Sequence, residues 1–447
     1  MRQKLLELDE RLRRALTRRV PDAACVAAAL ATLIAFAALL ATRTLGELSG
    51  ADGLTRAATV AILCAPLALM LLFAVRAARE SGLTLLAACA VCALAMLMRL
   101  SFIDHVSSDY EIYLSDWLAK FGALSFSGSM RAGVGEYNVL YQYILFLVSR
   151  LSVPSLYAVK AVSLLGDALL AGALARLCAE KRADDAIPSL TALCAGLLLP
   201  SIALNGGMFA QCDSLYAACA LWGLALALDG KGSRSAAMFA LSLAFKLQAA
   251  FLLPIIAVLY AQRKLRLGDA LVFLGTLLLT ALPAMLGGKP LSAIIGIYTA
   301  QTGLYTGLTY NAPTLFGLMD TAGLNVYAYG NFGMALALGA CAALVAYGVR
   351  DAANNAESVD VVRLAFVMTL LVVFLLPRMH ERYFYLPVAL SLAASVRDRR
   401  LVPCAALLEF AMLATLWDMG LPLFACSAMV LAAIAWALLC GLRRKNA

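Results

Sequence analysis

The fold is decided in residues 82–110, where a long apolar run ends abruptly in polar residues. Residues 82–100 read GLTLLAACAVCALAMLMRL, and residues 101–110 read SFIDHVSSDY. The first stretch has the length that a helix needs to cross a bilayer and lacks the alternation of a barrel strand. The second stretch carries Asp104, Asp109 and one of the two histidines in the chain. Ionisable clusters are costly beside lipid, so we predict a membrane helix that leads into a functional loop.

Apolar runs of this kind recur along nearly the whole chain. Of its 447 residues 63% are hydrophobic and 14% are charged, with a mean hydropathy of +0.86, which excludes a soluble domain. We predict an all-α polytopic membrane protein with about 12–14 transmembrane helices, forming one domain over residues 21–447. The candidate segments are 21–43, 57–76, 82–100, 138–150, 156–178, 188–203, 211–229, 235–259, 268–287, 331–349, 361–376, 383–396, 402–418 and 420–441.

The N-terminal residues 1–20 have a different pattern. Leucines at positions 5, 8, 12 and 16 have helical spacing and are surrounded by basic residues, which predicts a cytosolic amphipathic helix at the membrane surface. The following segment, 21–43, is too long for a signal-peptide core, and no small-x-small cleavage site follows it. We therefore expect a retained membrane anchor.

The net charge of +9 could suggest a nucleic-acid partner, but the basic residues fall in short loops between apolar segments. This distribution is typical of cytosolic loops in membrane proteins, so we expect membrane lipids as partners and no nucleic acid. The basic groups lie within 11–19, 76–79, 263–266, 397–400 and 443–445.

The loop charges also predict the topology. With the N-terminus in the cytosol, counting segments places the loops 101–137, 288–330 and 377–383 outside and both termini inside. The same count places 204–210 in the cytosol, provided that 138–150 and 188–203 both cross; a re-entrant element would reverse this assignment. We expect an integral protein of a bacterial cytoplasmic membrane with an extracytosolic active site.

The twelve cysteines lie mostly inside apolar runs. Cys89 and Cys92 have the spacing of a redox or zinc pair, but they fall in mid-helix with no histidine nearby. Buried cysteine usually packs as a small apolar residue. The cysteines therefore predict neither a disulfide framework nor a metal site.

The external loop 101–137 contains a predicted helix start. Ser108 and Glu111 have the spacing of a capping box, which places Asp109 at the first helical position. Asp109 could either complement the helix dipole or act as a general base. An apolar stripe at helical spacing predicts that this helix lies in the membrane interface. The stripe consists of Tyr110, Tyr113, Leu114, Trp117, Leu118 and Phe121.

Two further polar groups interrupt apolar segments. Residues 206–214 read GGMFAQCDS and place Gln211 and Asp213 at the start of a helix, where Asp213 could be a cap or a site residue. Lys246 falls in the middle of 235–259, where an ammonium group needs an anionic partner. That partner is either a carboxylate, Asp167 or Asp213, or the phosphate of a ligand.

Two external loops could complete a binding site. Residues 377–383 read PRMHERY; Arg378 and Arg382 suit phosphate, and His380 can exchange protons near neutral pH. Residues 309–314 read TYNAPT and include Asn311. Such aromatic and amide groups suit carbohydrate, but they also suit an ordinary interfacial belt.

Taken together, these stretches resemble the GT-C superfamily of polytopic glycosyltransferases. The nearest likeness is to bacterial relatives of the PIG-V-type mannosyltransferases of GPI-anchor assembly. The 377–383 stretch is the most specific, and the order of all six stretches supports the resemblance. The matching stretches are 108–117, 137–141, 210–214, 245–254, 311–313 and 377–383.

The resemblance implies a GT-C-like fold and a polyprenyl-phosphate-sugar donor that is used outside the cytosol. The sugar would be a hexose, mannose or glucose, and the acceptor a glycan, a lipid or a protein. Asp109 matches the family's acidic base, and whether Asp104 or Asp116 also contributes stays open. Neither a cofactor nor a metal is required. The implied substrate-binding residues are Gln211, Asp213, Lys246, Gln248, Asn311, Arg378, His380, Glu381 and Arg382.

A transporter or flippase of a lipid-linked or anionic solute is the alternative. It would also use an intramembrane lysine and external polar loops. It gives no reason for an aromatic amphipathic helix and a His-Glu-Arg loop on one face. Neither reading assigns a role to Glu409 or to the segments 21–43 and 57–76.

Overall fold

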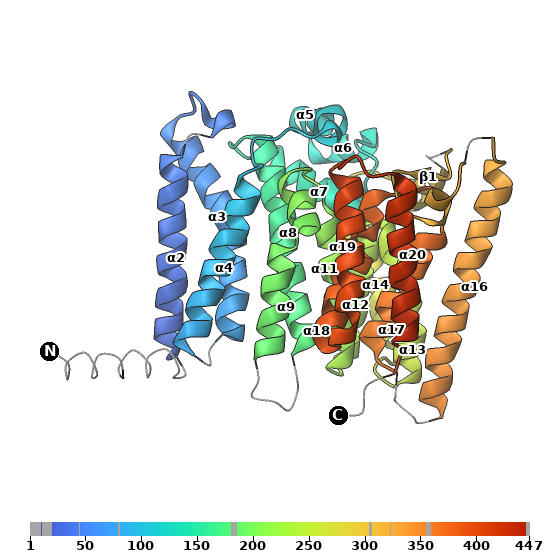
Figure 1. Ribbon diagram of the computed structural model, residues 1–447. Coiled ribbons are helices and arrows are strands. Elements are labelled where there is room, and N and C mark those ends of the chain that lie inside the picture. The colour runs from blue at the N-terminus through green and yellow to red at the C-terminus, as the bar shows by residue number, and fades with distance from the viewer. Residues whose placement is uncertain are drawn as a thin grey trace.

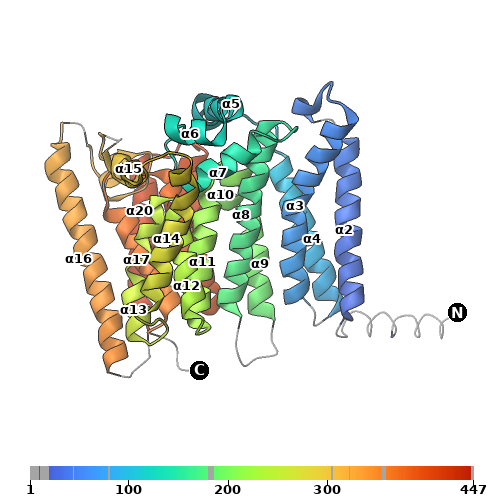
Figure 2. The ribbon, with the colours of Figure 1, turned by 180° about the vertical axis from the view of Figure 1, so that it is seen from behind.

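The computed structural model describes residues 10, 20–43, 45–78, 81–179, 186–303, 306–321, 323–354 and 359–443. Most helices stand side by side with their axes roughly parallel (Figures 1 and 2), as expected for an all-α polytopic membrane protein, and this fold class is confirmed. The predicted N-terminal amphipathic helix, 1–20, lies outside the described residues apart from Glu10 and Val20.

Fewer helices than predicted have full membrane-spanning length. Among the described residues, six are long and apolar enough to cross, and a pair bent by 49°, α9 (Ile187–Leu198) and α10 (Pro200–Gly207), would make a seventh. Shorter apolar helices fill much of the remaining bundle. The six are α2 (Asp22–Thr42), α3 (Gly53–Ala77), α4 (Gly82–Leu100), α8 (Ser155–Cys178), α14 (Asp269–Leu286) and α16 (Val326–Ala353).

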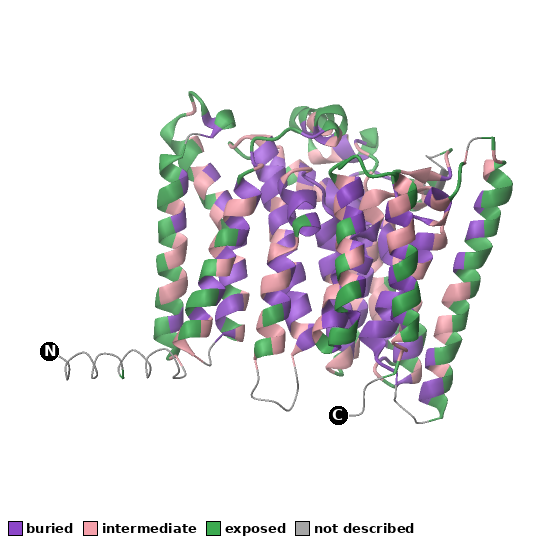
Figure 3. Ribbon diagram, viewed as in Figure 1, coloured by how far each residue is buried: buried purple, intermediate pink, exposed green. Residues whose placement is uncertain are grey.

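Helix α8 lies at the centre of the bundle and packs against α3, α9 and α11 (Asp213–Leu228). Small residues permit this packing, because a Cβ at Gly172 would lie 2.7 Å from the Phe73 ring of α3. At the edges, α2 and α16 expose most of their apolar side chains (Figure 3), as expected of helices that face lipid.

The first correction concerns 138–150, which does not cross. The helix there, α7 (Val139–Val148), has ten residues and so is only about 15 Å long. It stays beside α5 (Ser115–Ala123), because Arg150 at its far end donates to the Gly122 carbonyl at 3.1 Å. We call the face of the bundle that carries 101–138 and 376–384 the cavity face; it is uppermost in Figure 1.

The second correction concerns 235–259, which is not one helix. Helix α12 (Gly232–Phe245) stops at Lys246, and the chain turns back through η3 (Leu247–Phe251) into α13 (Ile255–Ala261). The chain returns to the start of the hairpin, since Ser233 Oγ donates at 2.7 Å to Oδ1 of Asp269, the first residue of α14. Lys246 therefore lies at the tip of a re-entrant hairpin.

Each correction removes one predicted crossing, so together they leave the segments after the hairpin on their predicted side and reverse only those between α7 and the hairpin. The turn 208–212 lies on the cavity face, because Ser107 Oγ donates to the Phe209 carbonyl at 3.0 Å. The prediction that 204–210 lies on the face opposite loop 101–137 was therefore wrong. The relative placement of 288–330 and 377–383 on the cavity face agrees with the prediction (Figure 1).

A two-residue parallel sheet joins the loops 306–318 and 376–384 on the cavity face. Strand β1 (Thr309–Tyr310) pairs with β2 (Met379–His380), with Tyr310 opposite His380. The remaining elements are α6 (Phe126–Ala132), α15 (Leu291–Gly303), α17 (Val361–Leu375), α18 (Tyr385–Arg397), α19 (Val402–Leu416), α20 (Leu423–Leu439) and the short helices η1 (Gly46–Leu48), η2 (Tyr110–Leu114), η4 (Leu315–Leu318), η5 (Glu381–Phe384) and η6 (Arg399–Leu401).

Glu409, for which the sequence suggested no role, caps a helix of another segment. Its carboxylate accepts from the Ser201 backbone N–H at 2.8 Å and from Ser201 Oγ at 2.6 Å. Ser201 is in the first turn of α10, whose backbone donors have no partner within the helix. Glu409 thus stabilises the bend between α9 and α10.

Candidate functional site

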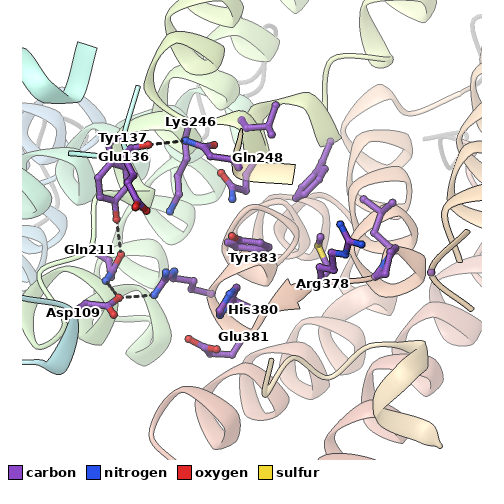
Figure 4. Close-up of a pocket in the computed structure, with 18 of the residues that line it drawn as sticks. Asp109, Glu136, Tyr137, Gln211, Lys246, Gln248, Arg378, His380, Glu381 and Tyr383 are labelled. Atoms are coloured by element: carbon purple, nitrogen blue, oxygen red, sulfur yellow. Dashed lines mark hydrogen bonds and ion pairs between the residues drawn. The ribbon is translucent and has the colours of Figure 1, made fainter. Parts of the chain in front are cut away.

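A cavity of about 750 Å³ opens on the cavity face between the helix that follows Asp109, the hairpin tip at Lys246, the first turns of α16 and the loop 376–383. Figure 4 shows its lining. The structure brings together eight of the ten residues predicted for the site. They are Asp109, Gln211, Lys246, Gln248, Arg378, His380, Glu381 and Arg382.

The loop that leads to Asp109 is held from below by Lys160 of α8. Its ammonium donates to the carbonyls of Phe102, Ile103 and His105 at 2.7, 2.9 and 2.7 Å. These carbonyls follow the end of α4, where helix carbonyls lack partners. Lys160 therefore acts as a buried cap that fixes the start of the loop.

The helix cap at Asp109 differs by one residue from the prediction. The side chain that accepts from the Tyr110 N–H, at 3.3 Å, belongs to Ser107 and not to Ser108. The same hydroxyl donates to the Phe209 carbonyl, so the cap also ties the loop to the 208–212 turn. Asp109 then precedes η2, a turn of π-helix, and such turns are frequent at functional sites.

The carboxylate of Asp109 is held through one oxygen. Its Oδ2 accepts from Gln211 Nε2 at 2.6 Å (Figure 4) and from Arg382 Nη1 at 2.7 Å. The side chain is 35% exposed, and in the described part of the chain both of these hydrogen bonds end on Oδ2. Oδ1 is therefore available to a molecule in the cavity.

Lys246 pairs with Asp213, one of the partners that the sequence left open. Lys246 Nζ lies 2.6 Å from Asp213 Oδ1, and the Asp213 side chain is fully buried. Asp213 Oδ2 also accepts from Asn205 at 3.4 Å. Asp213 does not line the cavity, whereas Lys246 does, so Asp213 can act on a ligand only by holding Lys246.

His380 lies between two tyrosines in the wall of the cavity. Its ring stacks on Tyr310 with centroids 5.0 Å apart and meets Tyr383 edge-on at 5.4 Å. Burial, with further contributions from Arg382 and Lys246, lowers the pKa of His380 to about 4, so the imidazole is neutral at pH 7. Burial also raises the pKa of the neighbouring Glu381 carboxyl.

The loop that carries His380 is shaped by a left-handed residue. Arg378 has φ +63°, which is uncommon for a side chain with Cβ, and its N–H donates to the Leu308 carbonyl at 2.8 Å. Asn311 also has a positive φ, +50°, but it does not line the cavity. Its Nδ2 donates to the Thr415 carbonyl at 2.8 Å, so Asn311 ties the β1 loop to α19.

The other two candidate bases lie outside the cavity lining. Asp104 accepts from the Gly46 N–H at 3.1 Å and from the Tyr157 hydroxyl. It therefore anchors the loop between α2 and α3, which gives these extra N-terminal helices a structural link to the site. Asp116 forms an exposed i,i+4 pair with Lys120 at 2.6 Å. Asp109 is the only one of the three that lines the cavity.

Several lining residues were not among the predicted site residues. Glu136 and Tyr137 come from the loop before α7, and Gln301 comes from the end of α15. Tyr137 was part of a matched stretch, so that signal was present in the sequence. Tyr327 of α16 belongs to the tyrosines of the predicted loop 288–330, which suit carbohydrate and an interfacial belt equally, whereas Asn331 gave no signal.

No protein-family model matches the chain, and no curated protein matches it. Among the described residues, no three His, Cys, Asp or Glu side chains lie close enough together to hold a metal ion. What the cavity offers is a carboxylate with an open oxygen and, around it, basic, amide and aromatic side chains.

Proposed function

We propose that the chain is a GT-C-like glycosyltransferase that moves a hexose from a polyprenyl-phosphate donor to an acceptor hydroxyl with inversion of configuration. The observation that carries the proposal is Asp109. Its Oδ2 is held by Arg382 and Gln211, while Oδ1 is open to a cavity that also contains basic side chains. A fixed carboxylate near clustered cations suits the removal of a proton and the departure of a phosphate.

The reaction would run as a single displacement. Oδ1 of Asp109 takes the proton of the acceptor hydroxyl as its oxygen forms a bond to the anomeric carbon. The bond from that carbon to the phosphate oxygen breaks, and its electron pair leaves with the polyprenyl phosphate. Lys246, Arg378 and Arg382 line the cavity and would stabilise the phosphate.

Arg382 has donors left for such a ligand. The terminal nitrogen Nη1 binds Asp109, while no hydrogen bond among the described residues engages Nη2, which is not fully buried. The planar fork of arginine can contact a carboxylate and a phosphate together. Arg382 would thereby couple the position of the base to the presence of the donor.

The distribution of charge supports an extracytosolic site. Basic side chains cluster opposite the cavity face, at 263–266 after α13 and at 397–400 after α18. Basic loops remain on the cytosolic side of membrane proteins. The cavity would then open outward, where lipid-linked sugars are consumed, and the N-terminus of α2 would lie inside.

The test uses protein in nanodiscs with radiolabelled polyprenyl-phosphate-mannose or polyprenyl-phosphate-glucose. Sugar release to water or to acceptor is measured beside donor binding. Asp109→Asn should lower turnover by about 10²–10⁴-fold, the usual loss for a general base, and should still bind donor. Asp116→Asn is the matched control, because Asp116 is an exposed aspartate of the same helical segment.

Asp104→Asn tests the remaining aspartate and should affect stability more than turnover, since Asp104 joins two loops. Near-normal turnover of Asp109→Asn would overturn the assignment of the base. Failure of the unaltered protein to release sugar from either donor would overturn the glycosyltransferase proposal itself.

A further inference from the structure

The helical segment that carries Asp109 presents two faces with different surroundings. Its buried stripe is Tyr110, Leu114, Leu118 and Phe121. The positions 109, 113 and 117, spaced by four, line the cavity, and Leu114 of the buried stripe also reaches it. Tyr113 and Trp117 therefore extend from the base along one wall, at positions fixed by the packing of the opposite face.

Trp117 is held rigidly by the loop before α7. A Cβ at Gly135 would lie 3.3 Å from Trp117 Cδ2 and 3.4 Å from Cε3, so the backbone of this glycine packs against the indole. Gly135 has φ +80°, which a residue with Cβ rarely adopts. Tyr137 meets the indole edge-on, with ring centroids 5.6 Å apart. The ring is thus fixed, and it lines the cavity rather than facing lipid.

Polar groups stand beside this aromatic wall. Glu136 lies between Gly135 and Tyr137, is exposed, and lines the cavity (Figure 4). Gln301 donates through Nε2 to the Glu136 backbone carbonyl at 3.1 Å, which fixes the amide beside the backbone of this residue. Both side chains can bind hydroxyl groups.

We infer that the acceptor is a neutral saccharide whose ring stacks on Trp117, with its hydroxyls bound by Glu136 and Gln301. The inference rests on the proposed function and names the acceptor class of the same site. A pyranose ring has an apolar face of C–H groups, which suits the electron-rich face of an indole. Its rim of hydroxyls suits a carboxylate and an amide. A lipid alcohol or a serine side chain has no such ring.

The position of the wall relative to Asp109 favours the acceptor over the donor sugar. An inverting displacement places the attacking hydroxyl opposite the leaving phosphate, and the base contacts the attacking hydroxyl. Trp117 is eight residues from Asp109 on the same helical face. The phosphate would bind Arg378, Arg382 and Lys246, which come from other elements. The base and the aromatic wall therefore serve one substrate.

The first experiment measures binding without donor, by calorimetry on protein in nanodiscs. The probes are mannotriose and maltotriose, with a short-chain alcohol and a serine-containing peptide for comparison. We expect a saccharide to bind and the other probes not to bind. Trp117→Ala should weaken this binding by about 10-fold, equal to about 1.4 kcal/mol, and Trp117→Phe should restore part of it.

Trp417→Ala is the matched control. Trp417 is a 47% exposed tryptophan at the cavity-face end of α19 that does not line the cavity, so saccharide affinity should be unchanged. Equal binding by Trp117→Ala and the unaltered protein would place the saccharide elsewhere and overturn the inference. Absence of saccharide binding, with sugar still released from the donor to water, would overturn the acceptor assignment while sparing the proposed function.

The second experiment separates the two substrates in the transfer reaction. In Trp117→Ala and Glu136→Gln, the KM for the saccharide should rise more than the KM for the donor. A larger rise for the donor would assign the aromatic wall to the donor sugar and overturn the inference. Binding of saccharide that depends on Trp117, with no transfer from any donor, would overturn the proposed function and leave a saccharide-binding site.

Discussion

Two kinds of ion pair lie inside this bundle, and they differ in what they face. The sealed pair joins Arg99 Nε to Asp167 Oδ2 at 2.8 Å, and both side chains are fully buried. The pocket pairs, Arg382–Asp109 and Lys246–Asp213, have similar distances of 2.7 and 2.6 Å. In each pocket pair at least one member lines the cavity. A buried charge therefore marks a candidate site only when a cavity reaches it.

The sealed pair has a structural task at the bend of α9 and α10. Arg99 Nη1 donates to the Leu197 carbonyl at 2.8 Å, close to the end of α9. Glycines of α10 cover the pair, since a Cβ at Gly206 would lie 3.3 Å from Asp167 Oδ2. The pair thus satisfies backbone groups at a helix break inside the membrane, where water cannot do so.

The largest effect should come from breaking the sealed pair. Arg99→Met leaves the Asp167 carboxylate buried without its partner, which should lower the free energy of unfolding by about 3–5 kcal/mol. Arg99→Met/Asp167→Leu removes both charges and should recover most of that loss. Reversible unfolding in mixed micelles measures both variants. Wild-type stability of the single variant would show that the sealed pair does not hold the bend.

A matched pair of double variants should separate the two kinds of ion pair by donor affinity. Lys246→Met/Asp213→Asn removes one pocket pair and should weaken donor binding by about 10- to 100-fold, the range for a hydrogen bond to a charged group. Arg99→Met/Asp167→Asn removes the sealed pair and should leave donor affinity unchanged. Equal losses in both variants, measured by calorimetry with folded protein, would remove Lys246 from the phosphate site.

The smallest effect concerns the histidine of the cavity wall. The pKa of His380 is lowered from 6.5 to about 4, so the unfolded chain binds a proton first as the pH falls. The free energy of unfolding should therefore decrease as the pH falls from 6.5 to 4. In His380→Asn this dependence on pH should be weaker. The charged and titratable groups near His380 include Glu381, Arg382, Lys246, Asp109, Tyr310 and Tyr383.

The control for this slope is His105→Asn, because the pKa of His105 is also lowered but His105 lies outside the cavity lining. Thermal midpoints between pH 4 and 7 give the comparison. If His380→Asn keeps the wild-type slope while His105→Asn loses it, His105 and not His380 accounts for the pH dependence.

Composition alone predicted the all-α membrane fold, because the length of apolar runs is set by the bilayer. It could not predict the hairpin at Lys246, since 235–259 is continuously apolar enough to read as one helix. The break lies at Lys246, where the side chain pairs with Asp213, and such a contact between segments is not visible in one stretch of sequence. Likewise, α7 is apolar because it packs against protein, and not because it crosses the membrane.

The sequence indicated most of the residues of the candidate site, but it did not indicate which of them line the cavity. Asp109 and the 377–383 loop stood out because ionisable clusters are unusual next to apolar segments. Asn311 lies outside the cavity lining, because its amide binds the Thr415 backbone carbonyl, and an amide in a loop can bind backbone as readily as ligand. Glu136 and Gln301 were missed, since the polar lining of a cavity becomes visible only when distant segments meet.

Reporter fusions that map the topology are affected by two elements. These are α7, which does not cross, and the hairpin at Lys246, which turns back. Compared with an arrangement in which 138–150 and 235–259 each cross once, each of these two elements changes the number of crossings by one. A reporter placed after α14 or at the C-terminus therefore lies on the same side in both arrangements. Only the segments between the two elements change side. A fusion in the 229–231 turn, or one within 208–212, would distinguish the two arrangements.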